Sequence, residues 1–237
     1  MVNYQYSYLV GGIILLVIWL ILFYLRKDVR KEMLFISIIF GIFGPFLNYI
    51  YFIDWWHPTT LTNTILSIED FLYCFTIAGI AAVIYEVVFK KKIRIRKINK
   101  IKKQKRNLKI KYLLLLSGLL LLISFYILKF NSLISTIIAL FIPTLIIYIK
   151  RKDLIIDSIA SGFLLLLVAF LGSMVLSIFF PEFVKALYYE HSSKIIIFNV
   201  PYWDLFFYFF AGAFIGPLYE YWQEAKLINI KNKNKPK

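Results

Sequence analysis

Long apolar stretches separated by short polar segments dominate this 237-residue chain. Seven of them are close to the roughly twenty residues that an α-helix needs to cross a bilayer. Because lipid-exposed backbone must satisfy its hydrogen bonds within the segment, these stretches are predicted to be helices rather than short alternating barrel strands. The predicted spans are 8–25, 33–53, 68–89, 112–130, 133–149, 154–180 and 203–222.

Two of these spans follow the same pattern. Residues 70–86 and 204–220 both begin with Asp, end with Tyr-Glu and align without a gap. Small side chains occupy matched positions and predict close helix packing. They are Ala78, Gly79 and Ala82 in one copy, and Gly212, Ala213 and Gly216 in the other. The repeat predicts two parallel three-helix units, residues 1–89 and 131–222, joined by a linking helix at 112–130.

Composition and charge make this an all-α polytopic membrane protein. The chain is 61% hydrophobic and only 17% charged, whereas soluble domains carry more charge. Its basic residues cluster in segments 26–32, 90–111, 150–153 and the tail 223–237. These alternate with connections that hold only three basic residues, Lys129, Lys185 and Lys194. The positive-inside rule then predicts a cell-membrane protein with its N-terminus outside and its C-terminus in the cytoplasm.

The net charge of +15 does not indicate nucleic-acid binding, since topology alone accounts for where the charge lies. The basic cytoplasmic loop 90–111 interleaves apolar residues with lysine and arginine, so anionic lipids are its expected partner. The sequence does not indicate an oligomeric state.

Acids at the heads of the two repeated spans are the candidate catalytic groups. They are Glu69, Asp70 and Asp204, and intramembrane carboxyls are functional hypotheses by default. Simple helix capping is the alternative, because the helix dipole favours acids at this end. The expected substrate contacts are Trp55, Trp56, Tyr73, Trp203 and Phe207, and the expected supporting residues are Asn48, His57, Glu86 and Glu220. Glu86 and Glu220 are equally expected to be packing residues at the cytoplasmic interface, near Lys90–Lys92 and Lys226.

Several kinds of chemistry are disfavoured. The single cysteine, Cys74, rules out an internal disulfide. His57 and His191 are not at ligand spacing with another metal-binding residue, so we predict no metal site. There is no Gly-rich phosphate loop, and span 203–222 has no lysine for a retinal Schiff base.

At these residues the chain resembles the membrane-integral lycopene cyclase domain family, the small carotenoid cyclases. An apolar helix, a basic turn, an outer Trp/Pro loop and an acid-headed helix ending in Tyr-Glu recur in both halves. The family hallmark is a proline, any residue, then two acids. Here Ser67 replaces the proline of the first copy, and Trp203 replaces the first acid of the second.

The resemblance implies a lycopene-type end-group cyclase acting on an apolar carotenoid from the bilayer. In the mechanism that the resemblance implies, a carboxylic acid protonates an end-group double bond, the cation closes a ring, and a carboxylate removes a proton. No net redox occurs, so no cofactor is expected. One hypothesis is that Glu69 and Asp70 supply the acid while the second copy supplies aromatic walls, which can stabilise cations. Glu69→Gln or Asp70→Asn would then abolish cyclisation.

Two other functions remain open on the sequence. A small transporter or channel of three, one and three helices would need a hydrated path from Asp70 or Asp204 to Glu86 or Glu220. A non-catalytic partner subunit with a cyclase fold would depend on a second membrane protein.

Overall fold

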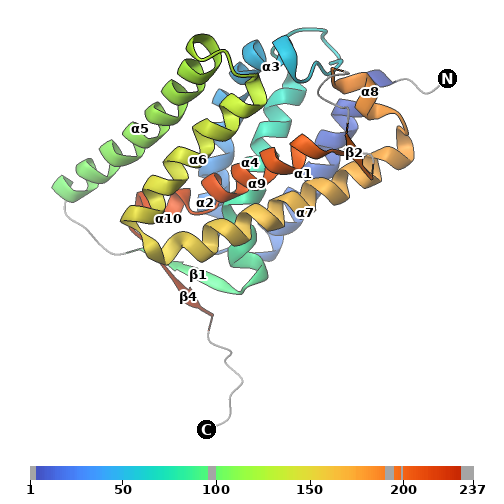
Figure 1. Cartoon of the computed structure of the whole chain (residues 1–237). Helices are drawn as coiled ribbons and strands as arrows, with labels where there is room; N and C mark the ends of the chain where they lie inside the picture. The colour runs from blue at the N-terminus through green and yellow to red at the C-terminus, as the bar shows by residue number, and fades with distance from the viewer. Residues whose placement is uncertain (1–3, 96–99, 190–194, 199, 231–237) are drawn as a thin grey trace.

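The protein is an all-α polytopic membrane protein (Figure 1). The computed structural model describes residues 4–95, 100–189, 195–198 and 200–230. Six helical segments in the described part are long and apolar enough to cross a membrane. Many aliphatic and aromatic side chains on their outer faces are exposed, as expected of surfaces that face lipid.

Most predicted spans coincide with helices. α1 covers Ser7–Leu25 after the short η1 (Tyr4–Tyr6), and α4 covers Ile68–Val88. α6 covers Ser132–Lys150, and α7 covers Ile155–Phe179 after the short η4 (Lys152–Leu154). The short helix α8 (Phe183–Leu187), in the connection that follows α7, was not predicted.

Two spans predicted as continuous helices are interrupted at Gly-Pro pairs. The second consists of α2 (Arg30–Phe43), the 3₁₀ turn η2 (Gly44–Leu47) and α3 (Asn48–Asp54). The last consists of α9 (Tyr202–Ile215) and α10 (Leu218–Gln223), separated at Gly216 and Pro217. Proline lacks an amide donor and its ring crowds the preceding turn, which explains both interruptions.

The segment 90–111 is not a simple loop. The strand β1 (Lys91–Arg94) pairs antiparallel with β4 (Lys226–Asn229), and α5 already begins within this segment, covering Lys100–Leu122. Lysine and arginine are good helix formers, so the basic composition does not stop the helix. α5 ends in the π-helical turn η3 (Ile123–Ile127), and a second short pair joins β2 (Ile196–Ile197) to β3 (Val200–Pro201).

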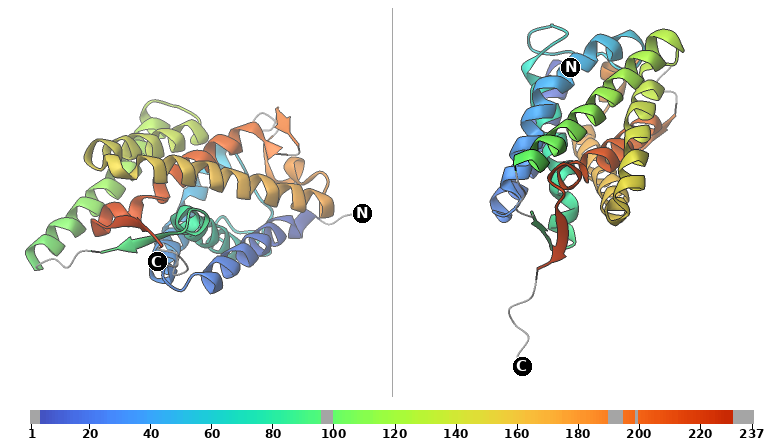
Figure 2. Two further views of the ribbon diagram at one scale, coloured as in Figure 1. Left: turned by 90° about the horizontal axis from the view of Figure 1, so that it is seen from below. Right: turned by 90° about the vertical axis from the view of Figure 1, so that its left-hand side faces the viewer.

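The basic connections meet at one end of the bundle, where β1 and β4 lie side by side (Figures 1 and 2). Arg26 donates to the Lys91 carbonyl, Lys109 bonds Glu224, and Arg151 donates to the Ala225 carbonyl. The described parts of all four basic segments are therefore linked. Residues 231–237 of the tail, and His191, lie outside the described residues.

α4 is the central helix of the bundle. Buried residues make up 61% of its apolar window, against at most 44% in the other five spans. A side chain at Gly79 would collide with Ser37 and Trp19, which are hydrogen-bonded to each other. A Cβ at Gly212 would lie 2.6 Å from the Ser161 carbonyl oxygen. The close packing predicted from the small residues is confirmed at these glycines.

Candidate functional site

A mostly apolar cavity of about 140 Å³ lies between the two halves of the chain, at the end of the bundle opposite β1 and β4. Its walls come from α1, α2, η2, α3, α4, α6 and α9. Aromatic rings dominate the lining, including Trp55, Trp56, Tyr73 and Phe207. A cavity of this kind, with a few convergent polar groups, is the usual form of a site for an apolar small molecule.

Asp70 enters this cavity from the first turn of α4, held by a capping box. Its Oδ2 accepts from the backbone amide of Ser67 at 2.9 Å and from the Ser67 hydroxyl at 2.7 Å. Its Oδ1 accepts from the Tyr8 hydroxyl of α1 at 2.8 Å. Helix capping and a role in the site were alternative predictions for Asp70, and its side chain does both. Oδ2 caps the helix and Oδ1 faces Tyr8.

Asp204 enters from the first turn of α9 and is 3% exposed. Its Oδ2 accepts a short hydrogen bond from the Tyr188 hydroxyl, which lies in the connection after α8. Burial and the neighbouring Asp204 raise the pKa of the Tyr188 hydroxyl well above its usual value. Tyr188 therefore stays protonated and donates, as Tyr8 does to Asp70.

The two halves of the cavity meet at a tyrosine pair. The Tyr73 and Tyr208 hydroxyls lie 2.9 Å apart, one from α4 and one from α9. Each tyrosine lies about one helical turn beyond its aspartate, Asp70 or Asp204, so all four side chains line the same cavity. The carboxyls among the described residues lining it are Asp70 and Asp204, one from each acid-headed helix.

The other predicted residues divide into two groups. Trp55, Trp56, Tyr73, Phe207 and Asn48 line the cavity, and the Asn48 side chain also donates to the Ile65 carbonyl at 3.1 Å.

Glu69, Trp203 and His57 are not part of the lining. Glu69 instead accepts from the Leu61 amide at 2.8 Å, so it fastens the preceding loop. The Trp203 ring is tilted against that of Tyr202 and packs on the apolar cluster around the cavity. His57 packs edge-on against Tyr189. The hypothesis of an acid from one copy and aromatic walls from the other does not match this geometry.

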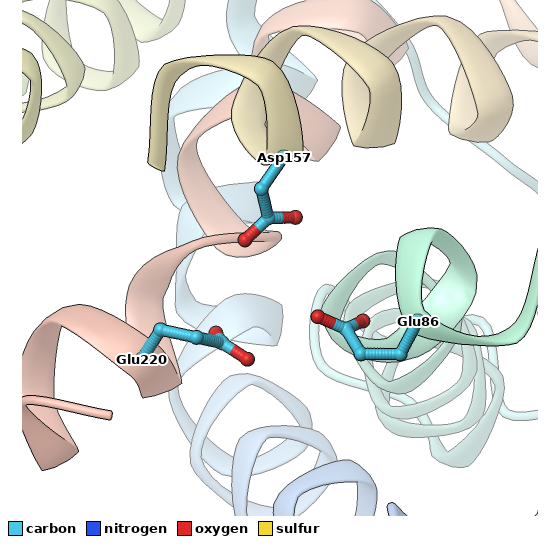
Figure 3. A group of neighbouring side chains, drawn as sticks. All are labelled: Glu86, Asp157 and Glu220. Atoms are coloured by element: carbon cyan, nitrogen blue, oxygen red, sulfur yellow. The ribbon is translucent and has the colours of Figure 1, made fainter. Parts of the chain in front are cut away.

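At the opposite end of the bundle, Glu86 and Glu220 meet inside the protein instead of lying at the interface. Together with Asp157 they point toward one another from α4, α10 and α7 (Figure 3). Carboxyl oxygens of the three lie within 4.8 Å of one another, and none of the residues is more than 1% exposed. Glu32 of α2, also 1% exposed, neighbours Glu86, Asp157 and Glu220. We call these four residues the inner carboxylate cluster.

Matching arginine contacts fasten the helix ends around this cluster. Two nitrogens of the Arg26 guanidinium donate to the two carboxyl oxygens of Asp28. Arg26 also donates to the backbone carbonyls of Glu86, at 2.9 Å, and Lys91, at 2.6 Å. This ion pair lowers the pKa of the Asp28 carboxyl.

Arg151 repeats the arrangement in the second half of the chain. Its guanidinium donates to both carboxyl oxygens of Asp153. It also donates to the backbone carbonyls of Glu220, at 3.3 Å, and Ala225, at 2.6 Å. The bonds to Asp153 raise the pKa of the Arg151 guanidinium, although burial of the side chain acts in the opposite direction.

Glu32, Asp157, Tyr8 and Tyr188 were not predicted as site residues. A signal for the first two exists: Arg-Lys-Asp occurs at 26–28 and 151–153, followed four residues later by Glu32 or Asp157. Nothing comparable marks the two tyrosines, since they lie outside the aligned stretches 70–86 and 204–220.

Taken together, these features define a helical membrane protein with an apolar cavity whose lining includes two buried carboxyls. Residues 5–88 and 131–222 match the model of the lycopene cyclase family, and the chain belongs to this family. The matched segments cover most of the chain and lie on either side of α5. Neither a curated protein nor a solved structure matches the chain. The family match supports a carotenoid-cyclase-like function.

Proposed function

We propose that the protein cyclises the end group of a linear, lycopene-type carotenoid in the cavity between Asp70 and Asp204. The observation that carries this proposal is the pairing of two buried carboxyls, each bonded to a tyrosine hydroxyl, inside an aromatic and otherwise apolar cavity. Family membership supplies the class of substrate.

The reaction is an isomerisation. One carboxylic acid gives its proton to the terminal double bond of the polyene and leaves a tertiary carbocation. A second double bond of the same end group attacks that cation, so one carbon–carbon bond forms and the cation moves to the ring. A carboxylate then takes a proton from a neighbouring carbon, which restores a double bond. Protons and electrons balance, so the reaction needs no redox partner.

The residues of the cavity suit each step. Asp70 and Asp204 can act as the acid and base pair, a task that needs two carboxyls in different environments. Their tyrosine partners, Tyr8 and Tyr188, fix the carboxyls in position. Rings of Trp55, Trp56 and Phe207 line the cavity and can stabilise the passing cation through their faces.

We further infer that the two halves are parallel repeats and that the cavity lies toward the outer side of the membrane. The matching Arg26 and Arg151 contacts support the repeat. The basic residues at the opposite end support a cytoplasmic C-terminus and contact with anionic lipids there. These inferences extend the seven-span prediction, in which α9 and α10 together form the last crossing.

The transporter alternative gains no support from the described residues. Ile80, Ala81, Ala82 and Val83 of α4 are at most 1% exposed and lie between Asp70 and Glu86. They belong to the main apolar cluster of the bundle. A hydrated path between the two acidic sites would have to cross this packed layer.

The test is to express the protein in a bacterial host that makes lycopene and has no cyclase. We expect β- or γ-carotene in extracts, identified by chromatography and absorption. Unchanged lycopene, beside wild-type protein that is folded and in the membrane, would contradict the proposal. Cyclisation only with a second membrane protein present would favour the partner-subunit alternative.

A further inference from the structure

The inner carboxylate cluster gathers acids from four helices at one buried point. Glu32, Glu86, Asp157 and Glu220 come from α2, α4, α7 and α10, so each half of the chain contributes two. Figure 3 shows the carboxyls of Glu86, Asp157 and Glu220 turned toward a common centre. The residues take no part in the cyclisation proposed above.

The cluster has almost no hydrogen-bond donors. Among the described residues, no donor reaches either carboxyl oxygen of Glu32, Glu86 and Glu220, or Oδ2 of Asp157. The remaining oxygen, Oδ1 of Asp157, accepts from the Ser161 hydroxyl at 3.2 Å. A buried carboxylate is normally paired with a cation or bound to a metal, or else takes up a proton. The seven unpartnered oxygens therefore leave a bound cation or shared protons as the two ways to neutralise the cluster.

The nearest basic side chains, Arg26 and Arg151, form their hydrogen bonds outside the cluster. Arg26 directs its guanidinium to Asp28 and to the carbonyls of Glu86 and Lys91. Arg151 does the same with Asp153 and the carbonyls of Glu220 and Ala225. Both arginines hold the backbone around the cluster and bond no carboxyl oxygen within it.

We propose that Glu32, Glu86, Asp157 and Glu220 bind a hard divalent cation of the calcium class. Carboxylate oxygens are the ligands that such ions prefer. Ligands on opposite sides of Ca²⁺ lie about 4.6–5.2 Å apart, given its usual bond lengths. One carboxyl oxygen each of Glu86, Asp157 and Glu220 lies within 4.8 Å of the other two, a spacing that suits ligands of one such ion, and Glu32 is the neighbouring fourth carboxyl.

The cation would tie the two halves of the chain together at this end, as the tyrosine pair does in the cavity. The sequence predicted no metal site because no two ligands fall at a recognisable spacing. The four carboxyls are brought together only by the packing of α2, α4, α7 and α10.

The test measures cation binding to the purified full-length protein in detergent, after treatment with a chelator. Mn²⁺ is the probe, because its free ion has a paramagnetic resonance signal that bound ion loses, and Ca²⁺ is the competitor. We expect one Mn²⁺ per chain, displaced by Ca²⁺. In Glu86→Gln/Glu220→Gln, affinity should fall by at least about tenfold, the lower end of what loss of a metal's supporting residues costs.

The matched control is Glu224→Gln, which changes an exposed acid at the same end that bonds Lys109. It should bind Mn²⁺ as the wild type does. No binding by the wild type, or equal binding by Glu86→Gln/Glu220→Gln, would overturn the proposal.

A second measurement avoids dependence on the folding of the double variant. The melting temperature of the wild type should rise with Ca²⁺ concentration, because a ligand of the folded state stabilises it. If acid alone raised the melting temperature and Ca²⁺ and Mn²⁺ left it unchanged, shared protons would hold the cluster and the cation proposal would be wrong. Neither measurement involves carotenoid, so failure of the cation proposal can be distinguished from failure of the proposed cyclisation.

Discussion

Two groups of buried carboxyls lie at opposite ends of the helix bundle, and they differ in their partners. In the cavity, Asp70 and Asp204 each accept a hydrogen bond from a tyrosine. In the inner carboxylate cluster, Glu86 and Glu220 have no donor among the described residues. A carboxyl fixed by neutral donors next to an open apolar space suits proton transfer to a substrate. Carboxyls that face only one another call for a positive charge between them.

The largest expected effect, and the strongest test of the difference between the two carboxyl groups, comes from removing the cavity carboxyls. Asp70→Asn and Asp204→Asn keep the side-chain shape but cannot exchange the proton, so each should lower cyclisation by about 10²–10⁴-fold. Carotenoid composition per unit of membrane protein is the measurement. Glu69→Gln is the matched control, because Glu69 fastens the loop at Leu61 and does not line the cavity. It should retain most of the activity, and loss equal to that of Asp70→Asn would contradict the assignment.

The tyrosine partners provide the next largest effect. Tyr8→Phe and Tyr188→Phe each remove one donor to a cavity carboxyl, a bond worth about 1.5–3 kcal/mol when one group is charged. Activity should fall roughly ten- to hundredfold, less than for the aspartate variants. The same assay measures it, with Tyr6→Phe as the control because Tyr6 is 47% exposed. Full activity in both cavity variants would show that the tyrosines do not position the carboxyls.

Close packing around the two acidic sites predicts a stability effect. Gly212→Val places side-chain atoms against the Ser161 carbonyl and the Gly162 Cα, so it should destabilise the fold by about 1–3 kcal/mol. Unfolding by heat or by denaturing detergent would detect this. Gly118→Val is the control, since nothing lies within 4 Å of a Cβ at that position of α5. Similar losses for both variants would argue against tight packing of α7 on α9.

The smallest expected effect lies at the Arg26–Asp28 pair, beside the inner carboxylate cluster. Its hydrogen bond lowers the pKa of Asp28 in the folded protein, so the pair stabilises the fold above the unfolded pKa of about 4. That contribution is lost as the pH falls through the lower folded value. Asp28→Asn should therefore cost about 0.2–1 kcal/mol at neutral pH, allowing for solvent screening, and nothing in acid. A pH-independent difference would contradict this account.

The sequence predicted the helices well because length and hydrophobicity alone decide whether a segment can cross a bilayer. Helix interruptions at Gly44-Pro45 and Gly216-Pro217 were readable from the prolines but were not predicted. The strand pairing of Lys91–Arg94 with Lys226–Asn229 joins segments that are far apart in the chain, so no local sequence pattern predicts it.

The candidate site was harder to predict because neighbouring residues on a helix point about 100° apart. Glu69 and Asp70 are adjacent in sequence, yet only Asp70 lines the cavity. The repeat drew attention to Asp70 and Asp204 together, which the structure places around one cavity. Tyr8 and Tyr188 reach them through tertiary packing, which spacing along the chain does not encode.

The most direct test of the comparison is one carotenoid assay of Asp204→Asn beside Glu220→Gln, at equal amounts of folded protein in a lycopene-producing host. We predict that Asp204→Asn accumulates lycopene while Glu220→Gln still yields cyclised carotenoid. The reverse pattern, with cyclisation lost in Glu220→Gln and kept in Asp204→Asn, would place the chemistry at the inner carboxylate cluster and contradict this account.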